Sequence, residues 1–174
     1  MSDPSGNSRS HYPLRRAGLL ALAVLVVVVT AVWALSEWQA SGRTPVVLNG
    51  TAVPPVPALN PARVAKGAAL YGQYCASCHG ANLEGVPDWR TSLDDGSFPP
   101  PPHDSSGHTW HHSDTVLVDI IANGGKPARN SKMPGFGGQI TPEETQAILD
   151  FIKSRWGKQE REFQWWVTAS QSKP

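Results

Sequence analysis

The chain has 174 residues, a formal net charge of +1 at pH 7 and 17% charged residues. This length fits one domain, or one domain with an appendage, and the near-neutral charge excludes the strong basic field that favours nucleic-acid binding. Hydrophobic residues make up 40% of the chain, but they are concentrated near the N-terminus. The remainder, rich in Gly and Pro, has a thin apolar core, and small domains of this kind often need a disulfide, a metal or a cofactor.

The first predicted element is a transmembrane helix over residues 17–35, which follows a predicted cytoplasmic segment at 1–16. None of these 19 residues is charged, and as a helix they would rise roughly 28 Å, close to the hydrocarbon thickness of a bilayer. Three arginines precede the run and Glu37 follows it, which predicts a cytoplasmic N-terminus and an exported remainder. A cleavable signal peptide is the alternative, but the run exceeds the usual signal-peptide core, which favours a retained anchor.

Residues 36–60 are predicted to form a Pro-rich linker. Four prolines in this segment disfavour regular structure and favour extended polyproline geometry. The alternative is a strand or two from "PVVLNGT" packed on the following domain. The proline content favours the extended tether.

A helix is predicted to begin at the start of the next segment, residues 61–157. Asn60 supplies a side-chain cap, and Pro61 occupies the first helical position. Apolar residues then recur at spacings of four, three and four along one stripe: Val64, Ala68, Tyr71 and Cys75. The helix therefore leads directly into the cysteine motif.

Two further helices are predicted in the same segment. One follows a possible cap at Ser113 and stops at Gly124. The other begins with the capping box "TPEE" at residues 141–144 and ends at Gly157. Its apolar face consists of Ile148, Phe151, Ile152 and Trp156.

Cys75 and Cys78 are the chain's two cysteines, and His79 follows directly. A structural zinc site needs four ligands, a thioredoxin-like pair needs alternating strands and helices, and a disulfide across so short a loop would stabilise little. C-x-x-C-H is the attachment signature of c-type haem. It predicts one covalent haem c, held by two thioethers, with His79 as an axial ligand of the iron.

Met133 is the predicted second axial ligand. It lies in "NSKMPGFGG", where Pro134 disfavours helix at the preceding residue. The glycines that follow, Gly135, Gly137 and Gly138, allow the backbone to pass close to a flat ring. A methionine in such a loop is poorly placed to fill a core, and its thioether is a plausible iron ligand.

Taken as a set, these motifs resemble the class I monohaem cytochromes c, of the membrane-anchored bacterial type. The resemblance covers 61–157 and rests on "KGAALYGQYCASCHG", "AILDFIKSRW" and the Met133 loop. It implies an all-α fold, with about three to four helices around one haem. Gly67 and Tyr71 match the small and aromatic positions at a helix crossing, where Ile148 and Phe151 match the other helix.

The stretch "HDSSGHTWHH", residues 103–112, is rich in histidine. It predicts a polar loop over the haem edge, in which Trp110, His108 or His111 contacts the haem and hydrogen-bonds a propionate. A second metal site is the alternative, since imidazole suits copper and zinc. A third possibility is that one of these histidines replaces Met133 on the iron.

The tail, residues 158–174, carries Phe163, Trp165 and Trp166. Exposed tryptophans suggest docking to a partner subunit or contact with the bilayer surface. A short helix folded back onto the cytochrome domain explains them equally well.

The predicted function is a tethered electron carrier on the outer side of the cytoplasmic membrane, with a periplasmic or extracytoplasmic haem domain. Its partners are membrane-bound redox complexes, donor and acceptor, with no nucleic acid and no small-molecule substrate. It is not an enzyme and has no catalytic residues. The alternatives are a fixed haem subunit of a respiratory or photosynthetic complex, or a haem sensor or peroxidase if Met133 leaves the iron open.

Overall fold

The computed structural model describes residues 12–41, 44–126 and 130–171, and the contacts divide the chain into two units, Met1–Arg43 and Thr44–Pro174. The first unit contains α1, Tyr12–Ser41; residues 1–11 of the predicted cytoplasmic segment lie outside the described residues. From residue 19 to residue 35 the side chains of α1 are exposed. Among the residues described, no helix combines the length and apolarity that a membrane crossing requires.

The second unit begins with a β-hairpin, β1 (Val46–Leu48) and β2 (Thr51–Val53), paired antiparallel. Asn49 and Gly50 form the turn with φ of 49° and 74°, and Asn-Gly is the sequence that best tolerates positive φ at both positions of a tight hairpin turn. The hairpin occupies part of the segment for which the prolines favour an extended tether. Residues 46–53 contain no proline, because the four prolines lie at positions 45, 54, 55 and 57. The Asn-Gly turn can therefore pair the two strands, as the alternative prediction for "PVVLNGT" expects.

Helix α2, Pro61–Tyr74, begins as predicted. The Asn60 side chain accepts a hydrogen bond from the Arg63 backbone N–H at 3.1 Å, and Pro61 starts the helix. After Cys75 the chain turns into α3, Ala76–His79. A 3₁₀ helix, η1 (Thr109–His111), and helix α4, Asp114–Asn123, follow.

Helix α5, Pro142–Lys153, has the predicted capping box, but it ends at Ser154, before Gly157. The Ser154 hydroxyl donates to the Phe151 carbonyl at 2.6 Å, which competes with the helical backbone pattern. The backbone N–H of Trp156 bonds the carbonyl three residues earlier, so the last turn is tightened. Trp156 is nevertheless buried, and its Nε1 donates to the His103 carbonyl at 2.8 Å.

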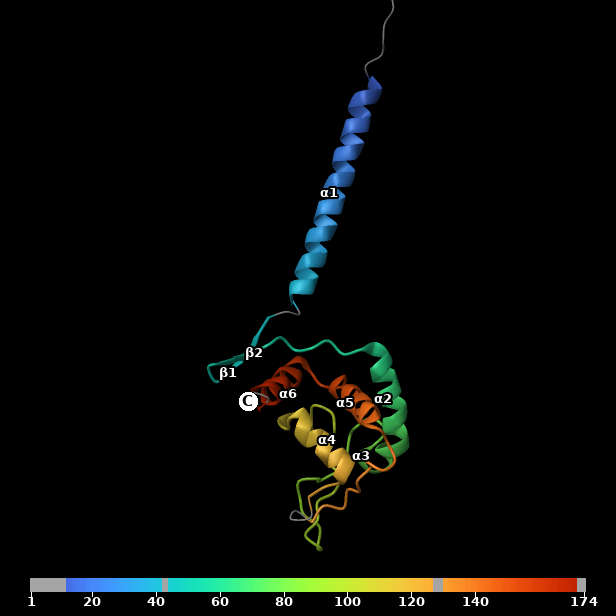
Figure 1. Ribbon diagram of the computed structural model, residues 1–174, viewed down its shortest axis with the longest axis vertical. Helices are drawn as coiled ribbons and strands as arrows, with labels where there is room; N and C mark the ends of the chain where they lie inside the picture. The colour runs from blue at the N-terminus through green and yellow to red at the C-terminus, as the bar shows by residue number, and fades with distance from the viewer. Residues whose placement is uncertain (1–11, 42–43, 127–129, 172–174) are drawn as a thin grey trace, which may run out of the picture. The chain divides into compact units, whose positions relative to one another are not determined.

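Helices α2 and α5 cross in close contact, as the resemblance implies (Figure 1). Gly67 lies at the crossing, where a Cβ would collide with the Ala147 carbonyl oxygen. Beside it, Tyr71 packs on Phe151 with ring centroids 5.3 Å apart. An ion pair of 2.5 Å from Arg63 Nε to the buried Asp150 carboxylate joins the same two helices.

The tail forms α6, Lys158–Gln171, which packs against η1. It also packs against both hairpin strands (Figure 1). Trp165 Nε1 donates to the Pro54 carbonyl at 2.6 Å, and Trp166 Nε1 donates to the Thr51 carbonyl at 3.1 Å. The structure therefore agrees with the prediction that the tail is a short helix folded back onto the domain.

A buried polar network joins α6 to α4 and α5. Gln164 Nε2 lies 2.6 Å from Asp114 Oδ1, 3.2 Å from the His112 carbonyl and 3.0 Å from Thr168 Oγ1. Lys153 Nζ bonds the same Asp114 carboxylate at 2.6 Å. Because Gln164 is 2% exposed, no water replaces its hydrogen bonds readily.

Replacing Gln164 by alanine is expected to lower the free energy of unfolding by about 2 kcal/mol, because buried acceptors lose their donor. Gln159→Ala is the matched control, since Gln159 lies on the same helix and is exposed. Urea denaturation of both variants measures the difference. Equal midpoints for the two variants would show that the network does not hold α6 in place.

Candidate haem site

The C-x-x-C-H motif lies at the junction of α2 and α3. Cys75 is buried, Cys78 is exposed, and both are free thiols. Burial, and then the neighbouring Cys78, raise the pKa of Cys75 to about 11, so its thiol stays protonated at neutral pH. The two thiols therefore differ in their access to solvent.

His79 is buried, and its ring is held by one polar contact. Its Nδ1 lies 2.9 Å from the Pro101 carbonyl oxygen. A carbonyl only accepts hydrogen bonds, so Nδ1 carries the proton and Nε2 keeps its lone pair. Burial lowers the pKa of His79, partly offset by this hydrogen bond. A neutral imidazole with a free Nε2 and a bonded Nδ1 is the usual state of a metal-ligating histidine.

Among the histidines of residues 103–112, His103 is distinguished by its contact with His79. Its ring stacks on His79 with centroids 3.9 Å apart and planes at 26°. The edge of the stack meets Tyr71, whose ring centroid is 6.0 Å from that of His103. Burial and the adjacent His79 lower the pKa of His103 well below its usual value. Sequence patterns placed His103 in the loop but gave no signal for this contact.

The loop that carries Met133 packs against the end of α4. The Met133 carbonyl accepts a hydrogen bond from the Gly125 N–H at 3.0 Å, and its side chain is partly buried against the hydrophobic core. A Cβ on Gly135 would lie 2.7 Å from the Ala122 carbonyl oxygen, whereas one on Gly138 would meet nothing within 4 Å. In this structure the close approach that Gly135 permits is therefore to α4.

Trp110, His108 and His111 lie around η1, in contact with other aromatic rings. Trp110 packs edge-on against Phe163 of α6, with centroids 5.6 Å apart, and His111 lies 5.5 Å from the same ring. His108 stacks on Trp89 at 5.0 Å. The residues described contain no group of three or more His, Cys, Asp or Glu side chains arranged to hold a metal ion, so the geometry gives the second-metal hypothesis no support.

The sequence matches the family described as "Cytochrome C oxidase, cbb3-type, subunit III" over residues 62–152. The chain belongs to this family. Comparison with curated proteins gives no match. The cytochrome c domain that defines the family confirms the resemblance to class I monohaem cytochromes c, and it identifies the chain as a c-type haem protein with one haem.

The residues of this cbb3-type domain suit a covalent haem. Two unpaired thiols lie next to a buried neutral imidazole, and a soft thioether is available in the Met133 loop. The buried side-chain groups without a hydrogen-bond partner among the described residues include Trp110 Nε1, Ser113 Oγ, the Tyr71 hydroxyl and His103 Nδ1. Buried N–H and O–H groups nearly always have partners, and a haem propionate would supply one.

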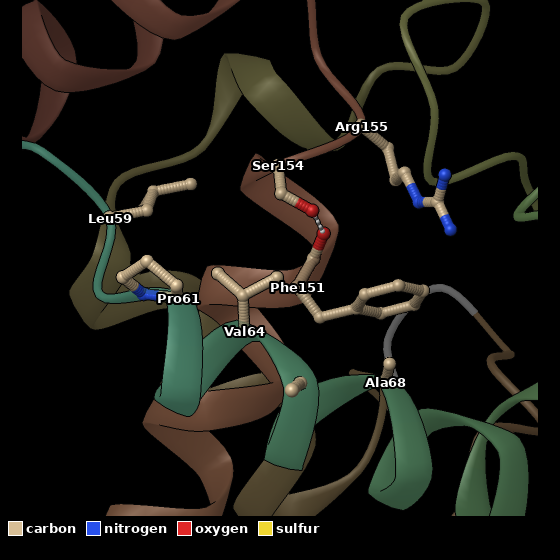
Figure 2. Close-up of a pocket in the computed structure, with 8 residues that line it drawn as sticks. Leu59, Pro61, Val64, Ala68, Phe151, Ser154 and Arg155 are labelled. Carbon is tan, nitrogen blue, oxygen red and sulfur yellow. Dashed lines mark hydrogen bonds between the residues drawn. The ribbon is translucent and has the colours of Figure 1, made fainter.

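A groove of about 460 Å³ lies between α2 and the C-terminal end of α5 (Figure 2). Its lining is mainly apolar and includes Leu59, Pro61, Val64 and Phe151, with Arg155 at its edge. None of the candidate haem residues lines it. The groove therefore does not belong to the haem site.

Proposed function

We propose that this cbb3-type cytochrome c domain carries single electrons between redox partners outside the cytoplasm. The observation that carries the proposal is the buried His79 ring directly behind two free cysteines, with its Nδ1 hydrogen bonded to the Pro101 carbonyl. Cys75 and Cys78 would hold the haem as thioethers. His79 and Met133 would supply an imidazole nitrogen and a thioether sulfur to the iron.

The haem supplies a one-electron couple, and the side chains tune it. Thioether ligation from Met133 favours ferrous iron and raises the potential relative to two histidines. Met133 as a ligand would leave no open position on the iron for oxygen or peroxide, which suits electron transfer rather than catalysis. Trp110 Nε1, which has no hydrogen-bond partner among the described residues, would donate to a propionate and help to orient the group. The protein needs no catalytic acid, base or nucleophile for this role.

We further propose that residues 17–35 anchor the chain in the cytoplasmic membrane. The run is uncharged, and it forms the middle of the helix Tyr12–Ser41. The arginines before it and the acidic residue after it favour an N-terminus in the cytoplasm. A tethered carrier has a high local concentration near membrane-bound redox complexes. The haem domain would face the periplasm or another extracytoplasmic space.

A second candidate function is a fixed haem subunit of a larger oxidase-type assembly. The description of the matched family, subunit III of a cbb3-type oxidase, favours it. A fixed subunit would remain with the assembly when membranes are dissolved in mild detergent and purified through a tag on this chain. A mobile carrier would elute alone.

The proposal predicts a haem-stained band in a denaturing gel of the membrane fraction, because a thioether-bound haem survives denaturation. The double variant Cys75→Ser/Cys78→Ser is expected to lose the stain completely. Ser77→Ala is the matched control, since Ser77 lies between the cysteines and is exposed. Staining of the double variant would refute thioether attachment, and a stained band only in the soluble fraction would refute the anchor.

A further inference from the structure

The His103 ring lies face to face with the ring of His79, 3.9 Å between centroids and 26° between planes. Pro101, whose carbonyl oxygen bonds His79 Nδ1, is only two residues before His103. A single short segment therefore touches the His79 imidazole twice, once at its edge and once on its face.

The backbone N–H and the backbone carbonyl of His103 are both hydrogen bonded. Its backbone N–H donates to the carbonyl of the fully buried Leu83 at 2.8 Å. Its carbonyl accepts from Trp156 Nε1, also at 2.8 Å. Pro102, immediately before it, has a fixed φ. The backbone that carries the stacked ring is therefore restrained by two hydrogen bonds and by the proline before it.

The two contacts constrain His79 in different ways. One hydrogen bond restrains the position of Nδ1, but small coupled rotations about the Cα–Cβ and Cβ–Cγ bonds can still tilt the ring plane. A ring stacked on its face limits this tilt. For an axial imidazole, the direction of the ring plane determines how its orbitals overlap with those of the metal, and outer contacts of this kind tune a metal site.

We propose that His103 is a positioning residue that fixes the plane of the His79 imidazole. This inference rests on the proposed ligation of the haem iron by His79. It requires an aromatic ring at residue 103, and it does not require that ring to ionise.

The first test uses the full-length, haem-loaded ferrous protein in detergent. Nuclear Overhauser effects between the ring protons of His79 and His103 are expected, because the stacked rings lie within reach of the measurement. Their absence would overturn the proposal without any substitution.

The second test compares His103→Leu, which removes the aromatic face but keeps an apolar side chain, with His103→Phe, which restores a ring. In the ferric protein, His103→Leu is expected to shift and broaden the highest g value in the electron paramagnetic resonance spectrum, and to change the spread of the haem methyl proton shifts. His103→Phe is expected to keep both close to the wild type. His112→Leu, which changes a histidine that packs edge-on against His108, is the control and should leave both unchanged.

A His103→Leu protein with wild-type spectra would overturn the positioning role, as would a His103→Phe protein that departs as far as His103→Leu. The near-infrared iron–sulfur charge-transfer band separates this failure from failure of the proposed function. If the inference alone is wrong, the wild type and all three variants keep the band. If the wild type lacks it, the proposed His79–Met133 ligation is wrong.

Discussion

Replacing Met133 by alanine is expected to abolish the near-infrared iron–sulfur charge-transfer band of the ferric protein and to lower its reduction potential. The band requires a thioether on the iron, and the loss of this ligand removes its preference for ferrous iron. We expect the reduction potential to fall by on the order of 100 mV, a small part of the roughly 0.8 V range over which axial ligands set haem potentials. Spectroscopic redox titration measures both changes.

Met133→Leu is the matched control for packing, because it keeps a side chain of similar volume in the partly buried position that Met133 occupies. Both variants should lose the band and gain the ability to bind carbon monoxide in the ferrous state, whereas the leucine variant should keep more of the stability. If Met133→Ala retained the band and the potential, the ligand assignment would be wrong. A wild type that already binds carbon monoxide would favour the sensor or peroxidase alternative.

The second large effect is expected from adding one methyl group at Gly67. A Cβ there would collide with the backbone carbonyl of Ala147 and come within 3.0 Å of Phe151 Cβ. Backbone atoms of a packed helix cannot rotate away, so α2 and α5 must separate. We expect Gly67→Ala to lower the free energy of unfolding by about 3 kcal/mol, the upper part of the usual cost of overpacking.

Gly72 provides a matched control on the same helix, because a Cβ at Gly72 would meet nothing within 4 Å. Gly72→Ala should raise the free energy of unfolding by about 0.5–1 kcal/mol, since alanine favours helix over glycine. Urea denaturation of the haem-loaded proteins measures both effects. Equal effects of the two substitutions would mean that the close crossing does not determine stability.

The features that could be predicted from the sequence are those encoded by adjacent residues. The Asn60 cap and the Thr141–Glu144 capping box appear in the structure because each is formed by residues three positions apart. The crossing at Gly67 could be anticipated from the resemblance, which supplies the missing long-range information. The early end of α5 could not, because it depends on competition between the Ser154 hydroxyl and the helical backbone.

The contacts that surround His79 could not be predicted from the sequence for a different reason. Four consecutive prolines precede His103, and nothing in the sequence indicates which of their carbonyls receives the Nδ1 proton. The stack of His103 on His79 joins residues 24 positions apart, and the hairpin's contact with α6 joins segments more than 100 positions apart. Such pairings depend on how the chain folds back, which spacing rules do not describe.

The hydrogen bonds from α6 to the hairpin have a practical consequence for expressing this protein. The family match stops at residue 152, yet the compact unit runs from Thr44 into the C-terminal tail. A fragment trimmed to the matched residues would leave the Trp110 ring without Phe163, and it would lack the buried valines Val46 and Val53 altogether. We therefore expect a fragment that keeps its fold to include residues on both sides of the haem-binding core, because the hairpin and α6 lose their shared hydrogen bonds when either is removed.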